Sequence, residues 1–201
     1  MTEPELTVRT AIDHHPVEQR RGTVLMLPGR AYSCGMSLLA WTTRALQADG
    51  WAVHQAFWDL SDLPGRPRGF VRVAAERLDA MERGPGPVLV VAKSLGTLAA
   101  HWGAERGYPA VWLTPVLETA GLRPLPGHSD ALADRIRDYP AANLVIGGTA
   151  DPLWRSGFQG TGTVLELDGA DHSLEVPDWR EALRLHERVA AAVADFAAGL
   201  D

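Results

Sequence analysis

The stretch from Val88 to Ala100, VLVVAKSLGTLAA, decides the fold of this chain. Its first four residues are apolar and mostly β-branched, which is typical of a parallel strand buried on both faces. Further along, Leu95, Leu98 and Trp102 have the spacing of one face of a helix. The chain is therefore expected to turn from strand to helix at the serine between these two segments.

That serine, Ser94, would lie at a sharp bend, which strains the backbone and crowds the residues two before and two after it. Ala92 and Gly96 occupy these two positions, and both are small. Such a bend raises the serine hydroxyl above the sheet edge and points the first N–H groups of the helix, which favour an anion, at the same place. A serine in an ordinary strand-to-helix turn is the alternative that this stretch alone leaves open.

Residues 92–96, Ala-Lys-Ser-Leu-Gly, resemble the nucleophile elbow Gly-x-Ser-x-Gly of the α/β-hydrolase family. The resemblance implies a small serine hydrolase of the esterase or dienelactone hydrolase kind. Ala92 departs from the usual first glycine, but only smallness is needed there. The loop over residues 115–128 is too short for more than a few turns of cap, which implies an open site.

Composition narrows the class of protein. The 201 residues are 46% hydrophobic and 22% charged, which suits one domain over 1–201 with a sizeable core. A net charge of -6 without a basic cluster argues against a nucleic-acid partner. Cys34 is the only cysteine, so no internal disulfide can form. We see neither a signal peptide nor a stretch of membrane-spanning length, and expect a cytoplasmic protein that binds no membrane.

Apolar segments alternate between strand and helix along the chain. The pattern predicts an α/β fold, with a mostly parallel sheet that carries helices on both faces. Strands are expected at the edge over residues 6–12 and internally over 23–27, 51–58, 88–91, 110–113, 144–146 and 163–167. Helices are expected over 36–48, 70–81 and 178–196, with short ones after Ser94 and Ser129; Asp178 should cap the last, and Trp179 and Leu183 should belong to its buried stripe.

In the family that the chain resembles, the loop before the first helix supplies half of an oxyanion hole. Here that loop is residues 28–35, so the backbone N–H of Arg30 or Ala31 is the expected donor, with the N–H of Leu95 as the second. Two fixed backbone donors suit an oxygen that gains negative charge during a reaction. Tyr32 in the same loop could line the site, whereas Cys34 lacks a base and is interpreted as a packed residue.

Two further residues follow predicted strands. Asp151 comes after the strand over 144–146, and His172 comes after the strand over 163–167. The resemblance assigns Asp151 as the acid that orients the histidine and His172 as the general base on Ser94. From local sequence alone, Asp151 could equally cap a turn before Pro152. Asp168 and Asp171 are the other candidate acids for this role, although Asp171 adjoins the histidine and is poorly placed to reach its ring.

Several residues keep two interpretations. Lys93 is either a solvated residue at the rim of the site or an electrostatic aid to substrate binding. Trp58 and Trp154 could line a substrate pocket or pack in the core. His101 and His186 are interpreted as packing residues in helices, and a substrate contact of His128 stays open. The pair His14-His15 lacks a carboxylate at ligand spacing, so we expect no metal site, and no organic cofactor is needed.

The order Ser94, Asp151, His172 is that of the α/β-hydrolase family. We therefore expect a hydrolase that cleaves a carboxylic ester, a thioester or a related acyl bond of a small molecule through an acyl-enzyme. The same scaffold also hosts lyases, cyclases and cofactor-free oxidation, so a non-hydrolytic enzyme is one alternative. A small-molecule-binding protein with a vestigial site is another. The sequence identifies neither the acyl group nor the oligomeric state.

Overall fold

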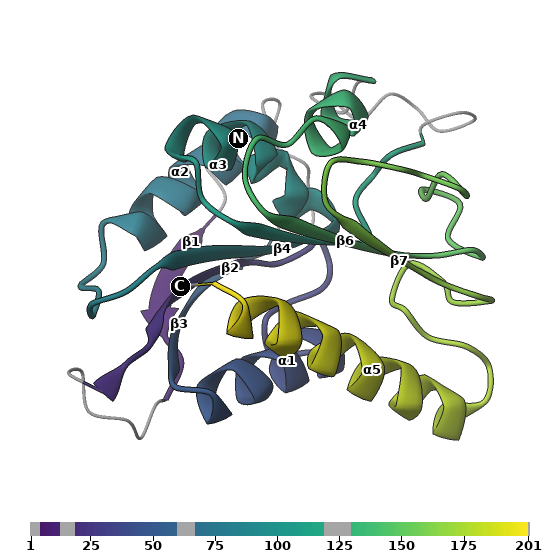
Figure 1. Ribbon diagram of the computed structural model, residues 1–201, viewed down its shortest axis with the longest axis horizontal. Helices are drawn as coiled ribbons and strands as arrows, with labels where there is room; N and C mark the ends of the chain where they lie inside the picture. The colour runs from purple at the N-terminus through teal and green to yellow at the C-terminus, as the bar shows by residue number, and fades with distance from the viewer. Residues whose placement is uncertain (1–4, 13–18, 60–66, 119–129, 201) are drawn as a thin grey trace.

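A central seven-stranded sheet organises the computed structural model, which describes residues 5–12, 19–59, 67–118 and 130–200 (Figure 1). The strands lie in the order β1-β3-β2-β4-β5-β6-β7, and all neighbours are parallel except β1, which is antiparallel to β3 at the edge. The predicted mostly parallel sheet is confirmed. The strands are β1 (Leu6–Thr10), β2 (Gly22–Leu27), β3 (Trp51–Trp58), β4 (Val88–Lys93), β5 (Ala110–Leu113), β6 (Asn143–Gly148) and β7 (Thr163–Leu167).

Helices cover both faces of this sheet, as predicted (Figure 1). One face carries α1 (Ser37–Ala48) and α5 (Trp179–Ala198), and the other carries α2 (Pro67–Asp79), α3 (Ala100–Arg106) and α4 (Asp130–Arg137). In the described ranges, no helix is long and apolar enough to cross a bilayer. The strand-to-helix turn after β4 differs from the prediction, because a 3-10 helix, η2 (Ser94–Ala99), precedes α3.

The central strands are buried on both faces, which explains their uninterrupted apolar sequence. In β4, Leu89 and Val91 face α1 and α5, whereas Val90 and Ala92 face the opposite helices. Each large apolar side chain buried in this way stabilises the fold by about 1.5–3 kcal/mol. The sheet thus gives rigid support to the loops that follow its strands.

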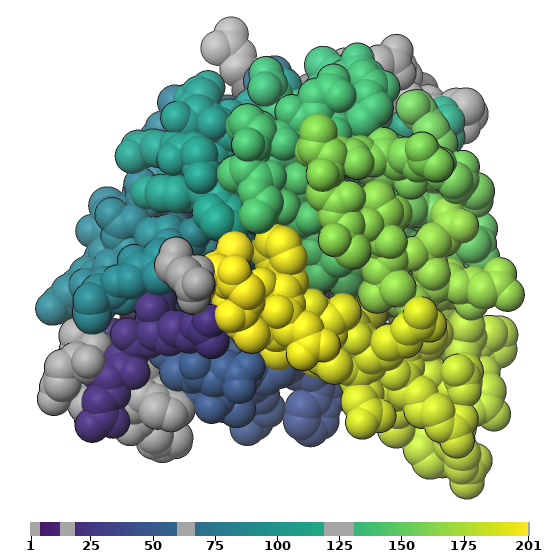
Figure 2. Space-filling view, in the orientation of Figure 1, coloured from purple at the N-terminus to yellow at the C-terminus, as the bar shows by residue number. Residues whose placement is uncertain are grey.

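The first turn of α5 confirms one prediction and contradicts another. Asp178 caps the helix as expected, since its carboxylate accepts hydrogen bonds from the N–H groups of Arg180 and Glu181. Trp179 and Leu183, however, are 60% and 52% exposed and do not belong to the buried stripe. The stripe that faces the sheet includes Val189 and Val193, and in the space-filling view the helix lies across the surface of the molecule (Figure 2).

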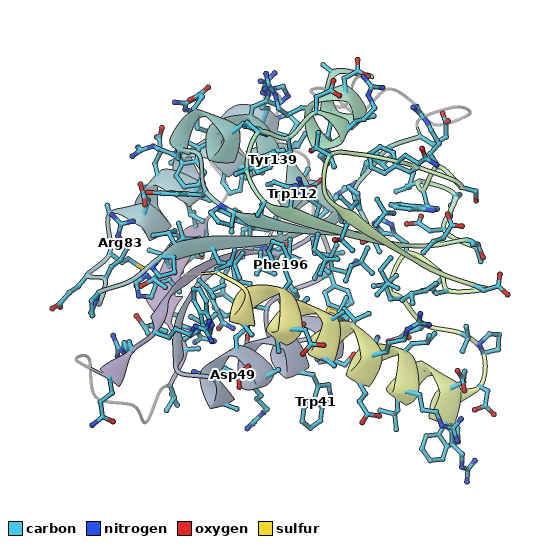
Figure 3. The ribbon with its side chains drawn as sticks, in the orientation of Figure 1. Trp41, Asp49, Arg83, Trp112, Tyr139 and Phe196 are labelled. Carbon is cyan, nitrogen blue, oxygen red and sulfur yellow. The ribbon has the colours of Figure 1, made fainter. Side chains whose placement is uncertain are left out.

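Aromatic side chains on the opposite face fill the space between sheet and helices. Trp112 of β5 meets Tyr139 edge to face, with ring centroids 5.2 Å apart (Figure 3). Trp41 on α1, by contrast, points away from the sheet and is 52% exposed (Figure 3). Trp112 and Tyr139 thus belong to the core. In open parallel sheets, binding sites form at the carboxyl ends of the strands.

Candidate active site

The turn between β4 and η2 holds Ser94 in a strained conformation. Its φ is 50°, in the left-handed region that residues other than glycine seldom adopt. Gly96 makes the turn possible, since a Cβ there would lie 2.6 Å from the carbonyl oxygen of Leu27 and 2.7 Å from that of Pro28. The chain thus bends sharply beside the end of β2, as the small residues around the serine predicted.

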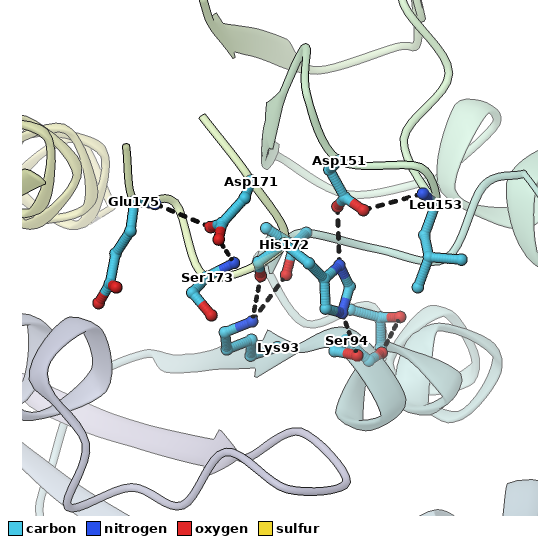
Figure 4. Close-up of polar contacts among 10 residues, drawn as sticks. Lys93, Ser94, Asp151, Leu153, Asp171, His172, Ser173 and Glu175 are labelled. Carbon is cyan, nitrogen blue, oxygen red and sulfur yellow. Dashed lines mark hydrogen bonds and ion pairs between the residues drawn. The ribbon is translucent and has the colours of Figure 1, made fainter. Parts of the chain in front are cut away.

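Three side chains from separate loops form one hydrogen-bonded chain (Figure 4). His172 Nε2 lies 2.8 Å from Ser94 Oγ, and His172 Nδ1 lies 2.7 Å from Asp151 Oδ2. The Asp151 side chain is fully buried, whereas that of His172 is 32% exposed. The buried carboxylate favours a proton on Nδ1, which leaves Nε2 free to accept the serine proton.

Asp151 also forms the local turn that its sequence allowed. Its Oδ1 accepts a hydrogen bond of 2.8 Å from the N–H of Leu153, while Oδ2 faces the histidine. The two interpretations of this residue are therefore compatible, one for each carboxylate oxygen. Fixing Oδ1 in the turn orients the second oxygen towards His172.

The loop that carries Asp151 is joined directly to the loop that carries His172. Ala150 N–H donates to the carbonyl of Ala170, and Thr149 Oγ1 accepts from the N–H of Gly169. Gly148 permits this approach, since a Cβ there would lie 2.1 Å from the Ala170 carbonyl oxygen. Acid and base are brought together by backbone pairing beyond the ends of β6 and β7.

The other candidate acids have different positions. Asp171 Oδ1 accepts hydrogen bonds from the N–H groups of Ser173 and Glu175, so it shapes the loop after the histidine. Asp168 accepts a hydrogen bond from the hydroxyl of Thr149 at 3.1 Å. Neither residue contacts the imidazole in the described part of the chain, and Asp151 is the acid beside it.

A pocket of about 300 Å³ opens over Ser94. Its walls combine the loop after β2 with apolar side chains from the loops after β5 and β6. The lining includes each backbone segment expected to donate to an oxyanion and two of the expected substrate contacts: Gly29, Arg30, Ala31, Tyr32, Lys93, Ser94, Leu95, Val116, Leu153, His172 and Ser173.

Trp58 and Trp154 do not belong to this lining in the described part of the chain. Trp58 Nε1 donates to the carbonyl of Gly29 at 2.8 Å, so it supports the loop after β2 from outside the pocket. Trp154 packs on Gly147, where a Cβ would lie 2.1 Å from its ring, and donates to Glu166 at 2.6 Å. Both indoles hold loops in place rather than face the cavity.

Lys93 is not the solvated rim residue that the sequence allowed. It is 1% exposed, and its Nζ donates to the carbonyl of His172 at 2.7 Å and to Thr114 Oγ1 at 3.0 Å. Burial lowers the pKa of Lys93 to about 8, although the negative charges of Asp151, Asp171 and Glu175 oppose that shift. Sequence alone does not indicate this arrangement, because Thr114 and His172 lie far from Lys93 along the chain.

The side chains that the sequence analysis interpreted as packing residues are buried or half-buried. Cys34 is 2% exposed, and burial raises the pKa of its thiol far above the usual range, as suits a packing residue. His186 is buried and lies 3.3 Å from the carbonyl of Ser173, and His101 is half-buried with a pKa lowered by burial to about 4. Within the described ranges no cluster of metal-ligating side chains occurs, and the pair at 14–15 and His128 lie outside those ranges.

Comparison with solved structures identifies the architecture. Est1E from Butyrivibrio proteoclasticus, in a structure with ferulic acid bound, matches with a TM-score of 0.74 and 14% identity, covering 98% of this chain and 96% of that one. The chain has the α/β-hydrolase fold. A dienelactone hydrolase from Anabaena variabilis matches at a TM-score of 0.69 and 17% identity, with 98% of this chain and 93% of that chain covered.

An esterase domain of a Rhodothermus marinus protein shares the same fold, at a TM-score of 0.64 and 19% identity over 95% of this chain and 99% of that chain. At the level of sequence, no family model matches the chain, and neither does any curated protein. At these identities the likeness establishes the α/β-hydrolase fold, and the chemistry must be argued from the site itself.

Proposed function

We propose that this protein is a serine hydrolase that cleaves a carboxylic ester or thioester of a small acyl group. The observation that carries the proposal is the continuous chain from Ser94 Oγ through the His172 imidazole to the buried Asp151 carboxylate. A hydroxyl with an adjacent base, itself oriented by a third group, is the arrangement that nucleophilic catalysis requires.

In the proposed reaction, Ser94 Oγ attacks the substrate carbonyl carbon while His172 Nε2 takes the hydroxyl proton. The N–H of Leu95 and that of Arg30 or Ala31, whose residues all line the pocket, would bind the oxyanion. Collapse of the intermediate breaks the bond to the leaving alcohol or thiol, which receives the proton from His172. Water then attacks the acyl-enzyme, with His172 again accepting and returning a proton, and the acid is released.

The size of the pocket supports a small acyl group. Its volume of about 300 Å³ lies at the lower end of the range for ligand sites. Val116, Leu153 and Leu95 give it apolar walls beside the serine. Esterases, a dienelactone hydrolase and a monoacylglycerol lipase from Paleococcus ferrophilus share the fold, which agrees with hydrolysis of an ester.

Labelling with a fluorophosphonate tests this function. Ser94 Oγ should form a bond to phosphorus as fluoride leaves, and mass spectrometry should place the adduct on the peptide that contains residues 92–96. Ser94→Ala should abolish labelling, whereas Ser173→Ala, at the rim of the same pocket, should retain it. No adduct on the unaltered protein, or an adduct that survives Ser94→Ala, would refute the proposal.

A panel of p-nitrophenyl esters of graded acyl length then tests the substrate class. Because the cavity is small, kcat/KM should be highest for acetyl to butyryl esters and should fall by about tenfold or more for octanoyl. A preference for the longest acyl chains would contradict a small acyl group without affecting the assignment of the nucleophile.

A further inference from the structure

Lys93 is a cationic side chain that the proposed mechanism leaves unused, although it adjoins the nucleophile in sequence. Three segments contact its ammonium, and Figure 4 shows its two hydrogen bonds as dashed lines. The loop after β7 offers the carbonyl of His172 at 2.7 Å, the end of β5 offers Thr114 Oγ1 at 3.0 Å, and the loop after β2 places the Tyr32 ring 4.5 Å away. All three contacts are with neutral groups.

Charged groups surround this site at longer range. The carboxylates of Asp151, Asp171 and Glu175 act on Lys93 through space, and the described residues place none of them within ion-pair distance of Nζ. A buried ammonium without a paired carboxylate is costly. Its pKa of about 8 follows from that burial, so the charge is present at neutral pH and lost in mildly alkaline solution.

The carbonyl that Lys93 holds belongs to His172 itself. His172 is therefore held at two points. Its ring Nδ1 lies 2.7 Å from Asp151 Oδ2, and its main-chain carbonyl accepts a hydrogen bond of 2.7 Å from Lys93 Nζ. Without the second contact, the main chain of His172 could shift and move the imidazole away from Ser94. Charge-assisted hydrogen bonds are roughly twice as strong as neutral ones, so the backbone anchor weakens when Lys93 loses its proton.

Strain in the chain around the ammonium supports a built arrangement. Thr114, which accepts the second hydrogen bond, is fully buried and has a φ of 42°. Its N–H donates to the carbonyl of Ile146 at 2.7 Å. A β-branched residue in the left-handed region is uncommon and persists only where its surroundings fix it. Thr114 thus presents its hydroxyl to Lys93 from the end of β5.

We propose that Lys93 is a positioning residue for His172, and that loss of the Lys93 charge sets the upper pH limit of the site. The inference rests on the proposed function, because it assumes that His172 must be held against Ser94 for turnover. Lys93 acts through the His172 backbone, and its side chain is 1% exposed, so it should affect kcat far more than KM.

The pH profile of kcat on a short acyl ester is the main test. The unaltered enzyme should lose about tenfold in kcat above pH 8, with KM within about twofold. Lys93→Arg keeps a charge that does not titrate in this range, so the alkaline fall should disappear. Thr114→Val removes one acceptor from the ammonium, which disfavours the charged form, and should move the fall to lower pH.

Lys93→Met covers the case in which arginine does not fit the buried site. It should lower kcat by about tenfold or more at pH 7, without an alkaline fall, while the circular dichroism spectrum stays that of the unaltered protein. An unaltered enzyme with no alkaline fall in kcat, or an alkaline fall that persists unchanged in Lys93→Met, would overturn the proposal while leaving the serine hydrolase intact.

Proton NMR gives a readout that needs no substrate. The proton between His172 Nδ1 and Asp151 should give a low-field signal whose shift follows a titration near pH 8, and Lys93→Met should abolish that titration. If no ester turned over but this coupling was present, the hydrolase would be refuted and the anchoring of His172 retained. A signal that ignores the Lys93 substitution would refute the anchoring.

Discussion

At the scale of the residue, the site depends on how Asp151 divides its two oxygens. Oδ1 fixes the turn through Leu153 N–H, and Oδ2 fixes the His172 ring. Asp151→Asn can keep the turn but offers an amide where the imidazole N–H needs an anionic acceptor. We expect kcat to fall by roughly a thousandfold or more, with little change in the free energy of unfolding.

Asp168→Asn is the matched control for this substitution. Asp168 lies in the same pair of loops and, among the residues that the structure describes, accepts a hydrogen bond only from the Thr149 hydroxyl, so kcat should stay within about threefold of the unaltered enzyme. Ester hydrolysis measured on both variants decides between the two acids. Equal losses, or a larger loss for Asp168→Asn, would contradict the role of Asp151.

At the scale of the element, the junction of β4 with η2 is the least tolerant part of the fold. A methyl group on Gly96 would lie 2.6 Å and 2.7 Å from two backbone carbonyl oxygens of the β2 end, which cannot move away without breaking the sheet. Gly96→Ala should therefore cost about 2 kcal/mol or more in the free energy of unfolding.

Gly35→Ala provides the comparison, since Gly35 is exposed and its nearest neighbour to an added Cβ is the Ser33 hydroxyl at 3.7 Å. Its free energy of unfolding should stay within about 0.5 kcal/mol of the unaltered protein. Urea denaturation of both variants measures the difference. A Gly96→Ala protein as stable as Gly35→Ala would show that the turn is looser than these contacts indicate.

The elements also show what local sequence can predict. Buried apolar runs located the strands, because a strand covered on both faces must be apolar throughout. Periodicity misplaced Trp179 and Leu183, since a helical pattern identifies an apolar stripe but not how far along the helix the core extends. The 3-10 turn of η2 was missed because its residues also suit an α-helix.

In the site, the convergence of Ser94, Asp151 and His172 could be predicted because each lies within a few residues of the end of a strand, and parallel strands bring their carboxyl ends to one edge. The environment of Lys93 could not be predicted from the sequence. Its partners are Tyr32, Thr114 and the His172 carbonyl, which come from three distant segments and meet only through the order of the strands.

At the scale of the whole molecule, the same lysine opposes stability. Its pKa of about 8 lies well below the value near 10.4 of an unfolded chain. Below pH 8 both states carry the charge, and the folded protein bears the full cost of burying it. Between pH 8 and about 10.4 the folded protein sheds the proton that the unfolded chain keeps, so this cost disappears as pH rises.

Lys93→Met should accordingly be more stable than the unaltered protein at pH 7, by an amount up to about 3 kcal/mol, because the lost hydrogen bonds offset part of the gain. The difference should narrow from pH 8 to pH 10. The buried groups Cys34 and Tyr139, whose pKa values are raised by burial, weaken both proteins alike at high pH and cancel in the comparison.

Urea unfolding of the two proteins at pH 7, 8, 9 and 10 measures this difference directly. A constant difference would mean that the Lys93 charge is not what separates them, and a less stable Lys93→Met at pH 7 would mean that its hydrogen bonds outweigh the burial cost. A variant that is more stable at pH 7 yet slower in turnover would show that the protein sacrifices stability to hold His172 against Ser94.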